Sequence, residues 1–121
     1  MNSQLIDRVQ LEKFTEGDPE LFPDLAVIFA RFVPGSIANL KVALENQDAA
    51  MLRENAHQLK SQLSYLFCES LIEQARHLEA IGRSGNLDGA KDLVEDISTD
   101  IGTLINEINS MTSLELRIEN E

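Results

Sequence analysis

Apolar residues recur every three or four positions along most of the chain, the spacing that puts them on one face of an α-helix. The clearest series lies near the C-terminus, where steps of four and three alternate through Ala90, Val94, Ile97, Ile101, Leu104, Ile108 and Met111. This series predicts a long amphipathic helix. After Ser110 the pattern lapses, so we expect residues 1–111 to form the domain and residues 112–121 a mobile C-terminal tail.

Two helices are predicted in the first part of the chain. A short one runs from about Gln4 to Phe14. A longer one begins near Asp18-Pro19, a typical helix start, and its apolar series continues to Leu44. Its apolar residues include Leu25, Ile28, Phe29 and Phe32. Within this helix, Val33-Pro34-Gly35 is expected to cause a kink or a break, because proline removes a helical hydrogen bond.

Two further helices are predicted in the middle of the chain. Asp48 is a good N-cap for a helix that runs to about Phe67. The next helix runs from Glu69 to Arg83, and Gly85 is a natural residue to end it. Four amphipathic helices joined by short polar turns predict an all-α fold, an antiparallel four-helix bundle with the short first helix at one end. A long coiled-coil dimer is the alternative, but the frequent turn signals argue against it.

Composition narrows the range of partners. The chain has 121 residues, the size of one domain, and is 43% apolar. Its net charge of −11 disfavours nucleic acid and anionic membrane surfaces as partners. Cys68 is the only cysteine, so it makes no internal disulfide and is expected to be a packing residue in a reducing cytosol.

The N-terminal residues contain no apolar run of signal-peptide length, and we find no stretch that approaches the length of a transmembrane helix. These features predict a soluble, cytoplasmic protein. The chain starts at a methionine and carries no linker scar, which favours a free-standing protein. The alternative is a domain excised from a longer kinase, which would look similar. We expect it to be a monomer.

The helix that follows Asp48 carries the residues of greatest chemical interest. Its buried stripe is predicted to comprise Leu52, Ala56, Leu59, Leu63 and Leu66. At about 100° per residue, Arg53, His57, Lys60 and Ser64 fall on a flank beside that stripe. His57 should therefore be exposed, with Lys60 one turn away on the same face.

An exposed histidine beside a lysine suits phosphoryl transfer. A neutral imidazole nitrogen is a competent nucleophile near neutral pH, and a second protein can reach it. A nearby ammonium can neutralise charge on the phosphoryl oxygens. The spacing of His57 and Lys60 alone is a weak signal, and on that ground a solvated polar face is favoured.

A family resemblance favours a phosphoryl-transfer site over a solvated polar face. Ala56-His57-Gln58-Leu59-Lys60 resembles the Ala-His-x-Leu-Lys-Gly signature of histidine phosphotransfer (Hpt) domains. The resemblance covers roughly residues 10–109, in order and without large gaps. It includes the turn at Gly17-Asp18-Pro19-Glu20-Leu21, Asp48 ahead of the histidine helix, and Gly85-Asn86-Leu87 after the next helix. The resemblance implies a helical bundle.

The resemblance also assigns expected roles to individual residues. His57 would accept the phosphoryl group at its outward ring nitrogen, and Lys60 would steady the phosphate. Glu79 stands where the family often has a polar residue that hydrogen-bonds the imidazole, and Arg83 where some members have a second basic residue. The family's glycine after the lysine is here Ser61, which narrows access to the histidine without closing it.

A second departure from the family lies near the end of the histidine helix. The family's Gly-Ala is here Phe67-Cys68, which puts local packing in question but not the phosphoacceptor. Arg53 and Lys60, with Arg76 and Arg83 across the groove, could form a basic docking patch around His57.

The implied function is that of a phosphorelay carrier rather than an enzyme. His57 would exchange a phosphoryl group with aspartates of response-regulator receiver domains, including those of hybrid sensor kinases. The carrier has no cofactor of its own, and magnesium is expected on the receiver. Without a glycine-rich phosphate loop or another nucleotide-binding signature, the chain has no predicted ATP site or kinase activity.

Two other functions stay open at this point. One is a non-catalytic module that docks on a receiver without carrying phosphate, and the other is a purely structural bundle, which leaves the motif unexplained.

Other candidate site residues are weaker. His77 lacks a lysine three residues later and is expected to be a surface residue without a functional role. Acidic residues in the last two helices and the turn between them include Glu69, Glu73, Asp88, Asp92, Glu95 and Asp96. They have no histidine or cysteine partner and no calcium-loop pattern, so a solvated face is favoured over a metal site.

Overall fold

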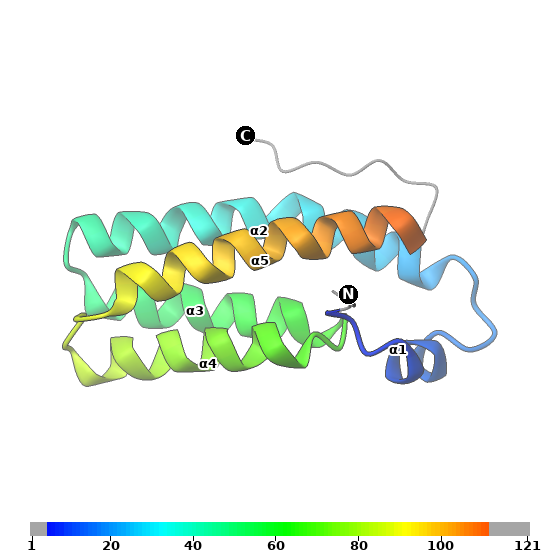
Figure 1. Ribbon diagram of the computed structural model, residues 1–121, viewed down its shortest axis with the longest axis horizontal. Coiled ribbons are helices and arrows are strands. Elements are labelled where there is room, and N and C mark those ends of the chain that lie inside the picture. Colours follow the sequence, from blue (N-terminus) through cyan, green and yellow to red (C-terminus); the bar gives the residue numbers. More distant parts are fainter. Residues whose placement is uncertain (1–4, 112–121) are drawn as a thin grey trace.

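The structure is a computed structural model that describes residues 5–111, and the predicted C-terminal tail lies outside this range. The described residues form five helices in the order α1 Arg8–Phe14, α2 Leu21–Glu45, α3 Ala49–Ser64, α4 Glu69–Ser84 and α5 Ala90–Met111 (Figure 1). This all-α architecture confirms the predicted fold class.

Helices α2 to α5 form an antiparallel four-helix bundle. Each of them packs against two others, in the cyclic order α2, α3, α4, α5 and back to α2. Short turns join successive helices, so their directions alternate, and the small helix α1 lies at one end of the bundle (Figure 1). The bundle encloses one core, as the periodicity of the sequence predicts.

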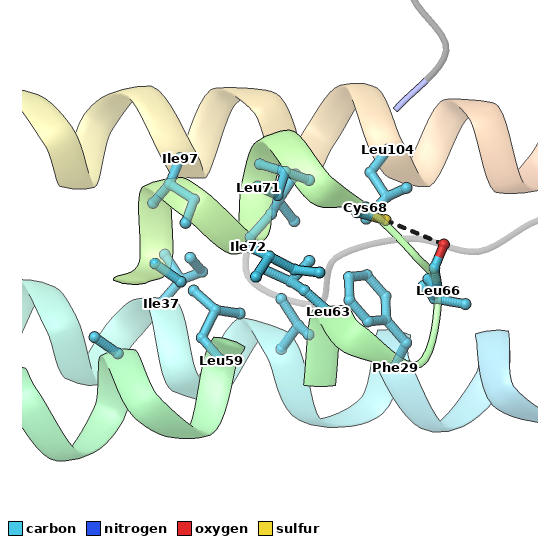
Figure 2. Close-up of a cluster of buried hydrophobic side chains, with 14 of the residues drawn as sticks. Phe29, Ile37, Leu59, Leu63, Leu66, Cys68, Leu71, Ile72, Ile97 and Leu104 are labelled. Atoms are coloured by element: carbon cyan, nitrogen blue, oxygen red, sulfur yellow. Dashed lines mark hydrogen bonds between the residues drawn. The ribbon is translucent and has the colours of Figure 1, made fainter. Parts of the chain in front are cut away.

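The core is built from the predicted apolar stripes. All five residues of the stripe predicted for the histidine helix are buried, including Leu66 just beyond the end of α3, and so is the α5 series from Ala90 to Ile108. Figure 2 shows how the four helices contribute: Phe29 and Ile37 from α2, Leu59 and Leu63 from α3, Leu71 and Ile72 from α4, and Ile97 and Leu104 from α5. Interdigitated leucine and isoleucine side chains at native density supply most of the stability of such a bundle.

Cys68 lies within this core, as expected for a packing residue. It is fully buried, and its thiol donates to the Leu66 carbonyl at 3.6 Å (Figure 2). Burial, and secondly the negative charge of Glu107, raises the pKa of Cys68 to about 12. The thiol is therefore protonated and unreactive at neutral pH.

The main correction to the predicted elements concerns Pro34. The expected break at Val33-Pro34-Gly35 is absent, because α2 runs as one helix from Leu21 to Glu45. Val33, Pro34 and Ile37 are all buried, so packing against the core outweighs the one hydrogen bond that proline removes.

Helix α2 also corrects the expectation about membrane spans. By length and composition alone, it is apolar enough to cross a membrane. This is weak evidence for a span, because the core helix of a soluble protein passes the same test. Here the buried side of α2 includes Phe29, Val33, Ile37 and Leu40, which pack into the bundle core.

Helix boundaries differ modestly from those predicted. Helix α1 begins at Arg8 instead of Gln4, and α3 ends at Ser64 instead of Phe67. Phe67 adopts a positive φ of 55°, which a right-handed helix does not accommodate. The predicted caps are confirmed: the Asp48 side chain accepts a hydrogen bond from the Met51 amide, and Gly85 ends α4 in the left-handed conformation.

A buried carboxylate that the sequence did not single out anchors the N-terminal segment. Glu107 on α5 accepts a hydrogen bond from the Leu5 amide at 2.6 Å and pairs with Arg8 at 3.3 Å. The Asp7 amide donates to the Phe67 carbonyl at 2.9 Å. These contacts fix α1 over the turn between α3 and α4.

Candidate functional site

His57 lies on the exposed flank of α3, as predicted. Ala56 and Leu59 point into the core, and this orientation turns His57 outward, so that 59% of its side chain is exposed. Lys60 follows one turn later and is more enclosed, with 24% of its side chain exposed. The histidine is therefore accessible to another protein while the lysine is held against the bundle.

A glycine sets the distance between α3 and α4 beside this pair. Gly82 is buried at their interface, and a Cβ atom at this position would lie 2.6 Å from the Arg53 backbone nitrogen and 2.8 Å from its Cα. Such distances are far below van der Waals contact. Only glycine permits this approach, which brings the side chains of α4 within hydrogen-bonding reach of His57 and Lys60.

The residue of α4 that reaches them is Glu79, one turn before Gly82. Its Oε2 atom lies 2.9 Å from His57 Nδ1, and its Oε1 atom accepts a hydrogen bond from Lys60 Nζ at 2.6 Å. The Arg83 guanidinium stands 3.7 Å from Oε2. We refer to His57, Lys60, Glu79 and Arg83 as the Glu79 cluster.

Glu79 is ionised at neutral pH although it is buried. The hydrogen bond from Lys60 lowers the pKa of Glu79, burial opposes this shift, and the hydrogen bond with His57 adds to it. A carboxylate only accepts hydrogen bonds, so the contact requires a proton on His57 Nδ1. The lone pair of the neutral imidazole then resides on Nε2, the ring nitrogen away from Glu79.

Most other predicted site residues surround this cluster without joining it. Arg53 and Ser61 are exposed on α3, and the Arg53 backbone contacts Gly82. Arg76 is one turn before Glu79 on α4, but its guanidinium pairs with Glu73. The proposed basic patch thus has Lys60 and Arg83 at its centre, whereas Arg76 is already neutralised.

Two alternative sites receive no support from the geometry. His77 is exposed on α4 and falls outside the Glu79 cluster. Within residues 5–111, no group of three or more histidine, cysteine and acidic side chains is arranged to hold a metal ion.

Three large apolar side chains are exposed on α2 and at the end of α3. Ile28 and Phe32 on α2, assigned to the helix's apolar series, are about half exposed, and so is Tyr65 at the end of α3. Ser36 donates to Gln62 at 3.4 Å, which fixes the register of the two antiparallel helices. Because α2 and α3 are antiparallel, Phe32, one turn before Ser36, and Tyr65, one turn after Gln62, lie toward the same end of the contact between the two helices.

Comparison with known families identifies the fold and its role. The family model for the Hpt domain matches residues 24–112, most of the chain. The chain belongs to the Hpt domain family. The Hpt fold is also seen in the crystal structure of histidine-containing phosphotransfer protein B (HptB) from Pseudomonas aeruginosa PAO1. That structure matches with a TM-score of 0.84 and 24% sequence identity over 91% of this chain and 96% of the other. No curated protein matches the sequence.

Membership gives this Hpt domain a phosphotransfer role in two-component phosphorelay. Hpt domains are phosphocarriers rather than enzymes, they interact with receiver domains, and they are typically soluble. A role as a docking module that carries no phosphate is not favoured. The family assignment alone does not identify the phosphoacceptor or the roles of the residues around it.

Proposed function

We propose that His57 carries the phosphoryl group of this Hpt domain. The Nε2 lone pair attacks phosphorus in the aspartyl phosphate of a receiver, the P–O bond breaks, and its electron pair returns to the aspartate carboxylate. Nδ1 keeps its proton, so the ring changes from neutral to cationic. The observation that carries the proposal is the 2.9 Å contact between His57 Nδ1 and Glu79, which leaves Nε2 as the nucleophilic nitrogen of a side chain that is 59% exposed.

Glu79 and Lys60 assist this step in different ways. The Glu79 carboxylate orients the imidazole and stabilises the positive charge that develops on the ring. The Lys60 ammonium, one turn from His57, attracts the oxygens of the incoming phosphoryl group. Neither residue exchanges a proton in the step, so the reverse transfer to a second receiver uses the same geometry.

Several finer features belong to the same proposal. The domain has no kinase activity and no cofactor of its own, and magnesium is supplied by the receiver. Its partners are receiver domains, including those of hybrid sensor kinases, and it works as a cytoplasmic monomer. Ile28, Phe32 and Tyr65 provide the apolar part of the docking surface, whose centre is expected to be drier than its charged rim.

Incubation with a phosphorylated receiver tests the proposal. We expect this chain to acquire phosphate that is labile in acid and stable in alkali, the behaviour of phosphohistidine. With ATP alone the chain should acquire none. Stable binding to the receiver without phosphate on this chain would instead support a docking module.

Replacing Lys60 should separate its chemical and structural roles. We expect Lys60→Ala to slow transfer about tenfold, because one cation that stabilises the transferring phosphoryl group is lost. The sequence alone predicts little effect on folding, but Lys60 is the partner of buried Glu79. The free energy of unfolding should therefore fall by about 1–3 kcal/mol. Transfer kinetics and urea denaturation provide the two measurements.

A double variant serves as the control for Lys60. Lys60→Met combined with Glu79→Gln removes both charges, so the loss of stability should be smaller than in Lys60→Ala, while transfer stays slow. Unchanged transfer in Lys60→Ala in both directions would remove Lys60 from the proposed site.

Charge near His57 should influence how the domain docks. The chain has a net charge of −11, and receivers are acidic at the phosphorylated pocket, so cations beside His57 should offset repulsion locally. We expect Arg83→Glu to slow association with a receiver more than Lys13→Glu, which changes the charge equally on distant α1. Stopped-flow association at low salt measures both rates. Equal slowing would show that only net charge matters.

A further inference from the structure

Before phosphorylation, both carboxylate oxygens of Glu79 have a hydrogen-bond donor without any contribution from Arg83. Glu79 is 7% exposed and has one donor on each oxygen, Lys60 on Oε1 and His57 on Oε2. Arg83 stands at 3.7 Å, beyond hydrogen-bonding distance, with 58% of its side chain exposed. Beyond its role in docking, this surplus donor has no role in the transfer step itself.

Phosphorylation of His57 changes which acceptors these donors bind. A phosphoryl group on His57 brings a charge of about −2 beside Lys60 and draws its ammonium toward the phosphoryl oxygens. Oε1 of Glu79 then loses its donor. The imidazole cannot replace Lys60, because its single remaining N–H is already bonded to Oε2. A buried carboxylate oxygen without a donor is strongly disfavoured.

Arg83 is placed to supply the missing donor. It follows Glu79 by four residues on α4, so the two side chains share one face of the helix. Its planar guanidinium has five N–H donors and can bond to both oxygens of one carboxylate. Arg76, the other arginine on this flank, is engaged by Glu73.

We propose that Arg83 is a positioning residue that closes onto Glu79 when Lys60 turns to the phosphoryl group. It keeps Glu79 bonded to Nδ1 of phosphorylated His57 and thereby prolongs the life of the phosphohistidine. The inference rests on His57 as phosphoacceptor. When Arg83 replaces Lys60 on Glu79, Lys60 can bind the phosphoryl group in the phosphorylated state and Glu79 in the unphosphorylated state. The buried Glu79 carboxylate is then paired in both states.

Chemical phosphorylation of the full chain tests this inference without a receiver. In phosphoramidate, His57 Nε2 attacks phosphorus, the P–N bond breaks, and ammonia leaves with a proton from solvent. We expect Arg83→Gln to become phosphorylated but to lose phosphate about threefold to tenfold faster than the wild type, the effect of one ordinary hydrogen bond, because Arg83 is partly exposed. Arg76→Gln is the matched control, with the same charge change on the same helix and a lifetime close to wild type.

A second background distinguishes positioning from general charge. In Glu79→Gln no buried charge remains, so adding Arg83→Gln should not shorten the lifetime further. Side-chain NMR of Arg83 should show slower exchange of its guanidinium protons after phosphorylation of the wild-type chain. Equal losses of lifetime in both backgrounds, or an Arg83 signal that does not change, would overturn the inference. Failure of phosphoramidate to label His57 would instead overturn the proposed function.

Discussion

A chain with His57→Gln should take up no phosphate from a phosphorylated receiver while remaining folded. Glutamine has no nucleophilic nitrogen, so no covalent intermediate can form. The side chain is more than half exposed, and a glutamine amide can still donate to Glu79, so the free energy of unfolding should change by no more than about 0.5 kcal/mol. Radiolabel transfer and thermal denaturation measure the two effects.

His77→Gln is the natural control for this experiment. His77 is also exposed, but it lies on α4 outside the Glu79 cluster. We expect this variant to accept phosphate at the wild-type rate. Retained labelling of the His57→Gln chain, mapped to His77, would show that the phosphoacceptor lies on α4 and that its assignment to His57 is wrong.

Gly82→Ala should have the largest effect on the bundle itself. The added methyl group would meet the Arg53 backbone at 2.6–2.8 Å, and neither helix can relieve the overlap by rotating a side chain. We expect a loss of about 1–3 kcal/mol in the free energy of unfolding, despite the better helix propensity of alanine. Widening the space between α3 and α4 should also draw Glu79 from His57 and slow transfer.

Gly102→Ala provides a comparison of the same chemical change within a helix. Gly102 lies inside α5, and a Cβ atom there would meet nothing within 4 Å. This variant should be more stable than the wild type by about 0.5–1 kcal/mol, because alanine is the better helix former. Destabilisation by both substitutions to a similar degree would show that the close approach at Gly82 is not decisive.

The helices and their buried faces could be predicted from the sequence because period and burial are local properties. The α3 stripe from Leu52 to Leu66 and the α5 seam both lie in the core as expected. The predicted break at Pro34 was wrong because the free-energy cost of one missing helical hydrogen bond is small compared with the gain from burying Val33 and Ile37. Ile28 and Phe32 fit the apolar series, yet they are exposed, because apolar spacing alone does not establish that every member of a series is buried.

The site could be predicted only in part. Helical spacing places His57 and Lys60 on one exposed flank, and the family resemblance points to Glu79. That Glu79 bonds to both of them depends on the distance between α3 and α4, which Gly82 sets. Glu107 escaped notice for a similar reason, because its partners Leu5 and Arg8 are remote in sequence. A local pattern carries no information about such pairings.

The most direct test of the account is to locate the phosphorus atom on the wild-type protein. Phosphorylation of the ¹⁵N-labelled chain, followed by heteronuclear NMR of its histidine rings, reports which nitrogen bears phosphorus and which bears a proton. Because Glu79 holds the Nδ1 proton, we predict phosphorus on Nε2 of His57 with Nδ1 still protonated. Phosphorus on Nδ1 of His57, or on either nitrogen of His77, would contradict the account.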